Sequence, residues 1–287
     1  MLSTDKTLRP DCNEILERKS DWSLSPSNFT NEFSVKHFIQ LCLKLKSLRK
    51  SFYYHFIESK FNNIFKKSFE SGNAKYYKEF KELDLIAFGT YGIVCNAMDR
   101  KSYDLFAIKK IPFNGGLKDS VMKEIQILQK LKSDLVVRLE SVWIEDNYLK
   151  IDDYKTDENM SFVSSLEVFK PNKTLLLHIQ MELCLMSLKE VIKQLNQELG
   201  QQLNEVMTPL GYYISSELFK EILEAVNYLH SLKPPIIHRD LKPTNILITE
   251  GKSGRFVKLA DFGLATIQEL DGKTLTKYVG TKGYAAP

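Results

Sequence analysis

HRDLKPTN occupies residues 238–245, and the strand-like run VKLA leads from it to DFG at 261–263. Moving a phosphoryl group requires an acceptor oxygen held in line and neutralisation of phosphate charge, with little covalent help from the protein. A carboxylate, a lysine and a carboxamide in one short loop, with another aspartate soon after it, supply the groups for that task. The pattern therefore predicts phosphoryl transfer to a hydroxyl, whereas His238 and Phe262 are expected to pack inside the domain.

Each polar residue in this pattern has its own expected role. Asp240 can accept and orient the proton of the acceptor hydroxyl, and Lys242 can reach the transferred phosphate. Asn245 and Asp261 carry oxygen atoms, which Mg²⁺ prefers as ligands. A lone aspartate in a loop is usually a turn residue, but five positions matched in one register make that interpretation negligible for the set.

An upstream segment contains the glycines of a candidate phosphate-binding loop. Residues 87–94, AFGTYGIV, resemble the pattern G-x-G-x-x-G-x-V, with Ala87 in the place of the first glycine. The strand-like FAIK at 106–109 follows, and Glu124 lies on a stretch with helical period. Lys109 is expected to hold the α- and β-phosphates, with Glu124 fixing its position. Both could instead be solvated surface charges, but their order and spacing disfavour that alternative.

These segments together form the signature of the eukaryotic protein kinases, which the chain resembles from about residue 75 to 287. The resemblance implies an α+β, bilobal fold, with ATP as phosphate donor and Mg²⁺ as cofactor. The expected parts are a β-rich small lobe at about 80–181, an insertion at about 146–173, and a mainly helical large lobe at 185–287, truncated after the activation segment. Hydrophobic patterns predict strands at 83–99, 103–111, 135–144 and 174–181, and helices at 119–131, 187–198 and 212–231.

The resemblance also implies a nucleotide site. Val94, Ala107 and Leu247 would form apolar walls around adenine, and the backbone of residues 180–184 would pair with its edge. The expected nucleotide-binding residues are Ile86, Ala87, Phe88, Gly89, Thr90, Tyr91, Gly92, Ile93, Val94, Ala107, Lys109, Glu124, Met181, Glu182, Cys184 and Leu247.

Within the family, the chain is similar to the kinases that phosphorylate the alpha subunit of eukaryotic translation initiation factor 2, especially the haem-regulated inhibitor branch. The resembling segments are KYYKEFKELDLIAFGTYGIV, DLVVRLESVWIED and LLLHIQMELCLMSLKEVI. The resemblance implies a serine acceptor in that factor, a brake on translation under stress, and a homodimer formed through the small lobe. Lys75 and Glu79 match the dimer contacts, although they could equally pair within one helix.

The N-terminal quarter matches the family poorly. Residues 1–30 are polar and are expected to form a loose leader, whereas 31–74 have a helical apolar stripe and form a predicted regulatory segment. His37 or His55 could ligate haem, but a helical histidine is more often packed or solvated. Haem is therefore the less favoured cofactor.

Composition excludes several other classes of protein. The hydrophobic share is 43 % and the charged share 26 %, as in globular proteins. A net charge of +4 gives no reason to expect nucleic acid, and no apolar run is long enough to span a membrane. Four separated cysteines suggest neither a zinc site nor a disulfide framework. A reducing, cytoplasmic location is the expectation.

Two further questions stay open on sequence alone. Thr276 and Thr281 are candidate self-phosphorylation sites, although Thr281 could equally be a structural hydroxyl near Asp240 and Lys242. A chain ending at Pro287 could also be an inactive fragment, or a truncated pseudokinase that binds nucleotide or a partner kinase. Besides the kinase and the pseudokinase, a third hypothesis is that residues 31–70 form a regulatory sensor for haem or for a membrane.

Overall fold

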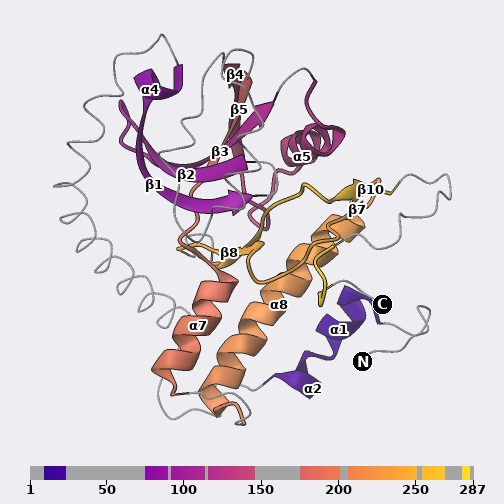
Figure 1. Cartoon of the computed structure of the whole chain (residues 1–287). Helices are drawn as coiled ribbons and strands as arrows, with labels where there is room; N and C mark the ends of the chain where they lie inside the picture. Colours follow the sequence, from indigo (N-terminus) through magenta and orange to yellow (C-terminus); the bar gives the residue numbers. More distant parts are fainter. Residues whose placement is uncertain are drawn as a thin grey trace. The chain divides into compact units, whose positions relative to one another are not determined.

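The computed structural model describes residues 10–23, 75–89, 92–113, 116–145, 175–200, 206–250, 254–268 and 280–284. It forms two compact units, one rich in β-structure and one mainly helical (Figure 1). One of the boundaries between them falls within helix α5 (Asp119–Lys130), after Met122. The mixed α+β architecture expected from the sequence is therefore confirmed.

The β-rich unit is built on one five-stranded antiparallel sheet in the order β1-β2-β3-β5-β4. Its elements are α4 (Lys75–Glu79), β1 (Phe80–Gly89), β2 (Gly92–Asp99), β3 (Leu105–Phe113), β4 (Leu139–Glu145) and β5 (Leu175–Glu182). The short strands predicted within 83–99, with a turn at Gly89 and Thr90, correspond to β1 and β2, which pair as an antiparallel hairpin. Gly92 follows its turn, and a Cβ atom there would lie 2.0 Å from the carbonyl oxygen of Lys110 on β3. Only glycine permits that approach.

A buried apolar cluster lies between α4 and the sheet. Tyr76 of α4 packs with Phe80, Ala97 and Ile108, and the partly buried Phe106 and Trp143 close the cluster. Residues of β1, β2 and β3 thereby bury their apolar surface under one short helix, which fixes α4 to the sheet.

The mainly helical unit is organised around the long helix α8 (Figure 1). Its elements are α1 (Cys12–Glu17), α2 (Lys19–Trp22), most of α5 (Asp119–Lys130), β6 (Met186–Ser187), α7 (Leu188–Glu198), α8 (Pro209–Ser231), β7 (Ile236–Ile237), β8 (Ile246–Ile248), β9 (Val257–Leu259) and β10 (Thr266–Ile267). The three short strands β6, β8 and β9 form one sheet, and β7 pairs with β10. These short strands bracket the segment that carries HRDLKPTN and DFG.

Helix starts in this unit follow capping chemistry. The Ser187 hydroxyl accepts a hydrogen bond from the Glu190 amide, and the Glu190 carboxylate accepts one from the Ser187 amide, so α7 begins with a capping box. Thr208 caps α8 by accepting from the Gly211 amide at 3.1 Å, with Pro209 in the first turn. Helix α8 therefore starts at residue 209, earlier than the predicted 212.

Part of the predicted strand 135–144 belongs elsewhere. Strand β4 begins only at Leu139, whereas the residues before it pair with β9 in the helical unit. The amide of Leu259 donates to the Leu135 carbonyl at 3.0 Å, and the amide of Val137 donates to the Leu259 carbonyl at 2.9 Å. Periodicity alone could not separate these two stretches because both are apolar.

The expected loose leader at 1–30 is wrong for residues 12–22. Asp11 and Glu14 form a capping box that starts α1. The following α2 is held against α8, where the ammonium of Lys19 lies 2.6 Å from the Glu217 carboxylate and the hydroxyl of Tyr212 donates to the Trp22 carbonyl. This segment is helical in spite of its polar composition because of its local capping and its contacts with residues distant in the sequence.

The predicted segment 31–74 and the insertion at 146–173 lie outside the described residues, as do His37 and His55. Within the residues that are described, no helix combines the length and apolarity needed to cross a bilayer.

Candidate active site

Asp240 is the centre of a hydrogen-bonded cluster in the helical unit. Its side chain, in a residue only 6 % exposed, receives the Thr281 hydroxyl at 2.6 Å on Oδ1. The Lys242 ammonium lies 2.9 Å from Oδ2, and the Asn245 carboxamide donates to the same oxygen at 2.9 Å. Lys242 also donates to the Thr281 hydroxyl at 2.9 Å. The sequence-predicted catalytic residues Asp240, Lys242 and Asn245 therefore meet in one place.

These contacts determine the protonation state of Asp240. Burial opposes the charged carboxylate, but the hydrogen bonds from Thr281 and Lys242 and the charge of Lys242 outweigh it, so the pKa of Asp240 is lowered. The group is thus an ionised acceptor at neutral pH, as a proton acceptor must be.

Two residues of this region have left-handed backbone conformations, which residues other than glycine rarely adopt. Arg239 has φ 65° and Asp261 has φ 62°. The guanidinium of Arg239 donates to the Leu264 carbonyl at 2.7 Å, which ties the residue before Asp240 to the segment after DFG. Such backbone strain persists where the surrounding contacts impose it, and it concentrates at functional sites.

His238 and Phe262 form the buried support expected from the sequence. They are 2 % and 0 % exposed, and their rings lie 4.9 Å apart. The Nε2 of His238 lies 3.0 Å from the Ala260 carbonyl, and the Asp240 amide donates to Nδ1. Burial lowers the pKa of His238, so the ring is neutral, with its proton on Nε2. It links the backbone of Asp240 to that of Ala260.

Asn245 and Asp261 are brought together by the backbone. The amide of Ala260, the residue before Asp261, donates to the Asn245 carbonyl at 2.9 Å. The side-chain nitrogen of Asn245 donates to Asp240, its Oδ1 accepts a hydrogen bond from the Thr244 hydroxyl at 3.4 Å, and Asp261 is an exposed residue. A carboxylate and a carboxamide oxygen suit Mg²⁺. The described residues contain no cluster of three or more histidine, cysteine, aspartate or glutamate side chains that would suit another metal.

The β-rich unit holds a second group of predicted residues. Directly opposed residues of antiparallel strands share one face of the sheet. Val94 pairs with Lys109, and Ala107 pairs with Met181. Because Ala107 and Lys109 are two apart on β3, all four lie on the same face. This face of the sheet thus combines apolar surface with the buried Lys109, which is 6 % exposed.

The remaining predicted nucleotide-binding residues are distributed over both units. Ile93 is fully buried in β2, whereas Ile86 and Ala87 are exposed in β1. Phe88 and Gly89 end that strand, and Thr90 and Tyr91 lie outside the described residues. Glu182 accepts from the Arg138 amide at 2.7 Å in the β-rich unit. Cys184 and Leu247 belong to the helical unit, as does the buried Glu124.

Ala87 departs from the glycine pattern without visible strain. It pairs with Val94 in the β1–β2 ladder, and it is not among the described residues with positive φ. An alanine therefore fits this position as a strand residue.

The Thr281 hydroxyl makes two hydrogen bonds, one as donor and one as acceptor. It donates to Asp240 and accepts from Lys242. A phosphate of about −2 charge at that oxygen would be placed against the Asp240 carboxylate. This arrangement favours the structural hydroxyl over phosphorylation at Thr281, while Thr276 lies outside the described residues.

Thr281→Ala should shift the acid side of the pH–rate profile to higher pH. Removing the hydroxyl removes a hydrogen bond that lowers the pKa of Asp240, so the carboxylate becomes protonated at a less acidic pH. Activity should therefore fall earlier as the pH decreases. The measurement is kcat against pH at saturating Mg-ATP. Thr266→Ala, in β10, is the control, and an acid limb that does not differ between the two variants would contradict the role given to Thr281.

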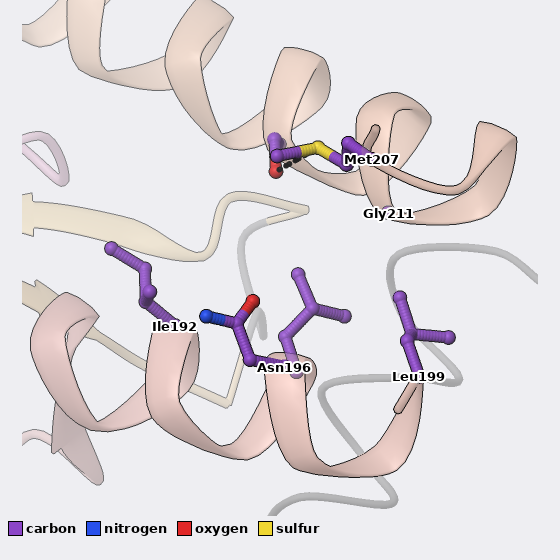
Figure 2. Close-up of a pocket in the computed structure, with 7 residues that line it drawn as sticks. Ile192, Asn196, Leu199, Met207 and Gly211 are labelled. Carbon is purple, nitrogen blue, oxygen red and sulfur yellow. Dashed lines mark hydrogen bonds between the residues drawn. The ribbon is translucent and has the colours of Figure 1, made fainter. Parts of the chain in front are cut away.

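A separate cavity of about 180 Å³ lies between α7 and α8 (Figure 2). Leu195 and Leu199 of the α7 side, and Met207 and Gly211 at the start of α8, contribute to an apolar lining that includes the polar Asn196. None of the lining residues belongs to the Asp240 cluster.

The comparison with known families matches residues 80–287 to the protein kinase domain. This chain belongs to the protein kinase family. The kinase is 32 % identical over 213 residues to the interferon-induced, double-stranded RNA-activated protein kinase of Rattus norvegicus, a match that covers 74 % of this chain and 36 % of the relative.

Other kinases are similar to a comparable extent. The mitogen-activated protein kinase mpkC of Aspergillus clavatus is 31 % identical over 218 residues, covering 74 % of this chain and 44 % of the relative. Cyclin-dependent kinase 10 of Rattus norvegicus is 29 % identical over 222 residues, covering 76 % and 50 %. The matches thus span between about a third and a half of the length of these relatives.

Proposed function

We propose that this chain carries the catalytic site of an ATP- and Mg²⁺-dependent serine/threonine protein kinase. The observation that supports this most strongly is the cluster around Asp240, in which Lys242, Asn245 and Thr281 all contact one ionised carboxylate. Membership of the protein kinase family indicates that the reaction is phosphoryl transfer. The cluster contains the carboxylate, the ammonium and the carboxamide that this reaction needs.

In this proposal each group of the cluster has one task. Asp240 orients the acceptor hydroxyl and takes its proton. Lys242, held beside that carboxylate, places positive charge near the transferred phosphoryl oxygens. Asn245 holds Asp240 through two hydrogen bonds of 2.9 Å, to its carbonyl and to its carboxylate. Asn245 and Asp261 would hold Mg²⁺, which supplies neutralisation of phosphate charge when bound.

The β-rich unit would provide the nucleotide contacts. Val94, Ala107 and Met181 offer apolar surface to adenine, and Lys109 on the same face would pair with the phosphates. In the helical unit, the Glu124 carboxylate lies 3.6 Å from the place of a Cβ atom on Gly263 of DFG. Glu124 would position Lys109 in the active kinase, as the family resemblance implies.

We further propose the alpha subunit of eukaryotic translation initiation factor 2 as the substrate. The support is the sequence resemblance of three segments to the kinases of that group, including the buried β5 and the strand β4 with Trp143. A cytoplasmic location and membership of the haem-regulated inhibitor branch are parts of the same proposal. Mitogen-activated and cyclin-dependent kinases match at similar identity, so their type of substrate is the competing outcome.

A competition assay tests the substrate. Full-length kinase is given labelled Mg-ATP with an equimolar mixture of the alpha subunit, its acceptor Ser→Ala variant, and a protein rich in Ser-Pro sites. The proposal expects label on the unaltered alpha subunit alone. Label on the Ser-Pro protein in preference to the alpha subunit would replace this substrate proposal with the competing one.

We also propose that the kinase forms a homodimer through the β-rich unit. Lys75 and Glu79 lie on one face of α4, 3.8 Å apart and about half-exposed, and Lys75 also lies over the Trp143 ring. In a two-fold dimer the same pair can exchange partners between protomers.

Charge reversal tests the dimer. Lys75→Glu should weaken dimerisation by about 2–10-fold, because exposed ion pairs are individually weak but occur twice at a two-fold interface. Adding Glu79→Lys to the same chain should restore it. Sedimentation of the full-length protein measures both variants, and a single variant that dimerises like the wild type would place the contact elsewhere.

A further inference from the structure

A row of three side chains crosses the sheet underneath α4. Lys110 on β3 is paired in register with His178 on β5, and His178 is paired with Trp143 on β4. Residues opposed in this way share one face of the sheet. Lys109 precedes Lys110 on the same strand and therefore faces the other side. The row thus lies directly behind the lysine proposed to bind phosphate.

Helix α4 closes over this row through Tyr76. The Tyr76 ring lies 5.2 Å from the His178 ring, and the Lys110 ammonium lies 3.9 Å from the centre of the Tyr76 ring. The Tyr76 hydroxyl donates to the Glu82 carboxylate of β1 at 2.7 Å, and Lys110 forms an ion pair with the same carboxylate. One buried junction therefore joins α4, β1 and β3.

A second carboxylate holds the start of α4 to the same sheet. Glu145 on β4 accepts from the Tyr76 amide at 2.8 Å and from the Trp143 indole at 2.8 Å. The Trp143 ring is stacked on the His178 ring at 4.9 Å. The helix is consequently attached both at its backbone and through its buried tyrosine.

The charges of the junction are balanced by Lys110 and Glu82. The Lys110 side chain is 1 % exposed and that of Glu82 is 12 % exposed. Burial disfavours the ammonium, but Glu82 outweighs it, so the pKa of Lys110 is raised. Burial and then the Lys110 charge lower the pKa of His178 to about 3. His178 is therefore neutral, and Glu82 is the anion that compensates Lys110.

We propose that Lys110, Glu82 and Tyr76 are positioning residues that set the place of Lys109 in the nucleotide site. A buried ion pair rarely adds net stability over apolar residues, but it can select a single arrangement of the elements that it joins. Here the selected arrangement fixes β3 at the residue next to Lys109, with respect to both β1 and α4. A shift of α4 on the sheet would move the Tyr76 ring, then Lys110, and with it Lys109. This inference rests on the proposed role of Lys109.

A paired substitution separates positioning from stability. Lys110→Met combined with Glu82→Gln removes both charges, keeps nearly the same volumes, and leaves no buried charge without a partner. Lys81→Met combined with Glu140→Gln removes the same two charges from exposed positions on the same sheet and is the matched control. Both are made in the full-length kinase, and thermal unfolding confirms that each is folded.

Two readouts report on Lys109 itself. One is KM for ATP measured separately from kcat, and the other is the rate at which Lys109 is modified by an adenosine analogue bearing a sulfonyl fluoride, whose fluoride the lysine amine displaces. We expect the buried double variant to raise KM and to slow modification, each by about 3–10-fold, because small displacements of reacting groups have large effects on rates. The surface variant should match the wild type.

The outcomes distinguish the two proposals. If Lys109 of the wild type is not modified, or if ATP does not protect it from modification, the role proposed for Lys109 is wrong. If the wild type is modified but the buried double variant has unchanged KM and modification rate, the junction is only structural and the inference is overturned. Should the double variant fail to fold, Tyr76→Phe, which loses only the hydroxyl bond to Glu82, carries the same two readouts with a smaller expected change. Restoration of wild-type values by Lys110→Arg with Glu82 intact would support positioning by the charge pair.

Discussion

Replacing Asp240 by asparagine should lower kcat by about 10²–10⁴-fold, the usual effect of losing a general base. The carboxamide has nearly the same shape, but it cannot take up the proton of the acceptor hydroxyl. It also presents an amide donor where Lys242 and Asn245 already donate. The proposed nucleotide contacts do not involve this side chain, so the Kd for Mg-ATP should stay within about 2-fold of the wild-type value.

The measurements are single-turnover phosphoryl transfer and equilibrium titration with Mg-ATP. Asp134→Asn removes an exposed carboxylate from the same unit and is the matched control. A kcat close to that of the wild type for Asp240→Asn would exclude this residue as the proton acceptor.

Asn245→Ala should lower kcat by about 10²-fold or more. The substitution removes both hydrogen bonds by which Asn245 holds Asp240, and misplacing a reacting group by about 1 Å can cost that much. It also removes one proposed oxygen ligand of Mg²⁺, so the Mg²⁺ concentration that gives half-maximal activity should rise.

The magnesium dependence separates the two roles of this residue. Asn245→Asp keeps an oxygen for the metal but puts a second carboxylate beside Asp240, so it should recover metal affinity more than turnover. Asn227→Ala on α8 is the control. If Asn245→Ala changes neither kcat nor the magnesium requirement, the arrangement of the site proposed above is wrong.

The members of the proposed catalytic cluster could be predicted from sequence because most of them are close together along the chain. Asp240, Lys242 and Asn245 lie within one short loop, and only Thr281 joins from a distance. The sequence alone is compatible with two roles for Thr281, a phosphorylation site or a structural hydroxyl near Asp240 and Lys242. The 2.6 Å contact with Asp240 and the 2.9 Å contact with Lys242 now favour a structural hydroxyl.

The junction behind Lys109 was not predicted. A lysine in a strand is usually interpreted as facing solvent, and nothing local shows that Lys110 is buried or that its partner is Glu82, on another strand. The available signal was the consecutive pair of lysines inside the otherwise apolar run FAIKKIPF. Side chains alternate along a strand, so one of the two had to face the covered side of the sheet.

The N-terminal helices were missed for a different reason. Polar composition suggested a loose leader, but the spacing of Asp11 and Glu14 is that of a capping box. A capping box alone does not stabilise six residues of helix. The contacts of Lys19 with Glu217 and of Trp22 with Phe219 are long-range, and no local pattern indicates them.

Rapid-quench analysis of one turnover tests the proposed catalysis most directly. Full-length kinase saturated with labelled Mg-ATP is mixed with excess alpha subunit. The label transferred to protein and the label remaining in ATP are then measured as a function of time. A catalytic Asp240 cluster predicts the appearance of phosphoserine at the rate of ATP loss, and its near absence in Asp240→Asn. Tight nucleotide binding with no transfer to any protein, in wild type and variant alike, would contradict a catalytic role and identify the chain as a pseudokinase.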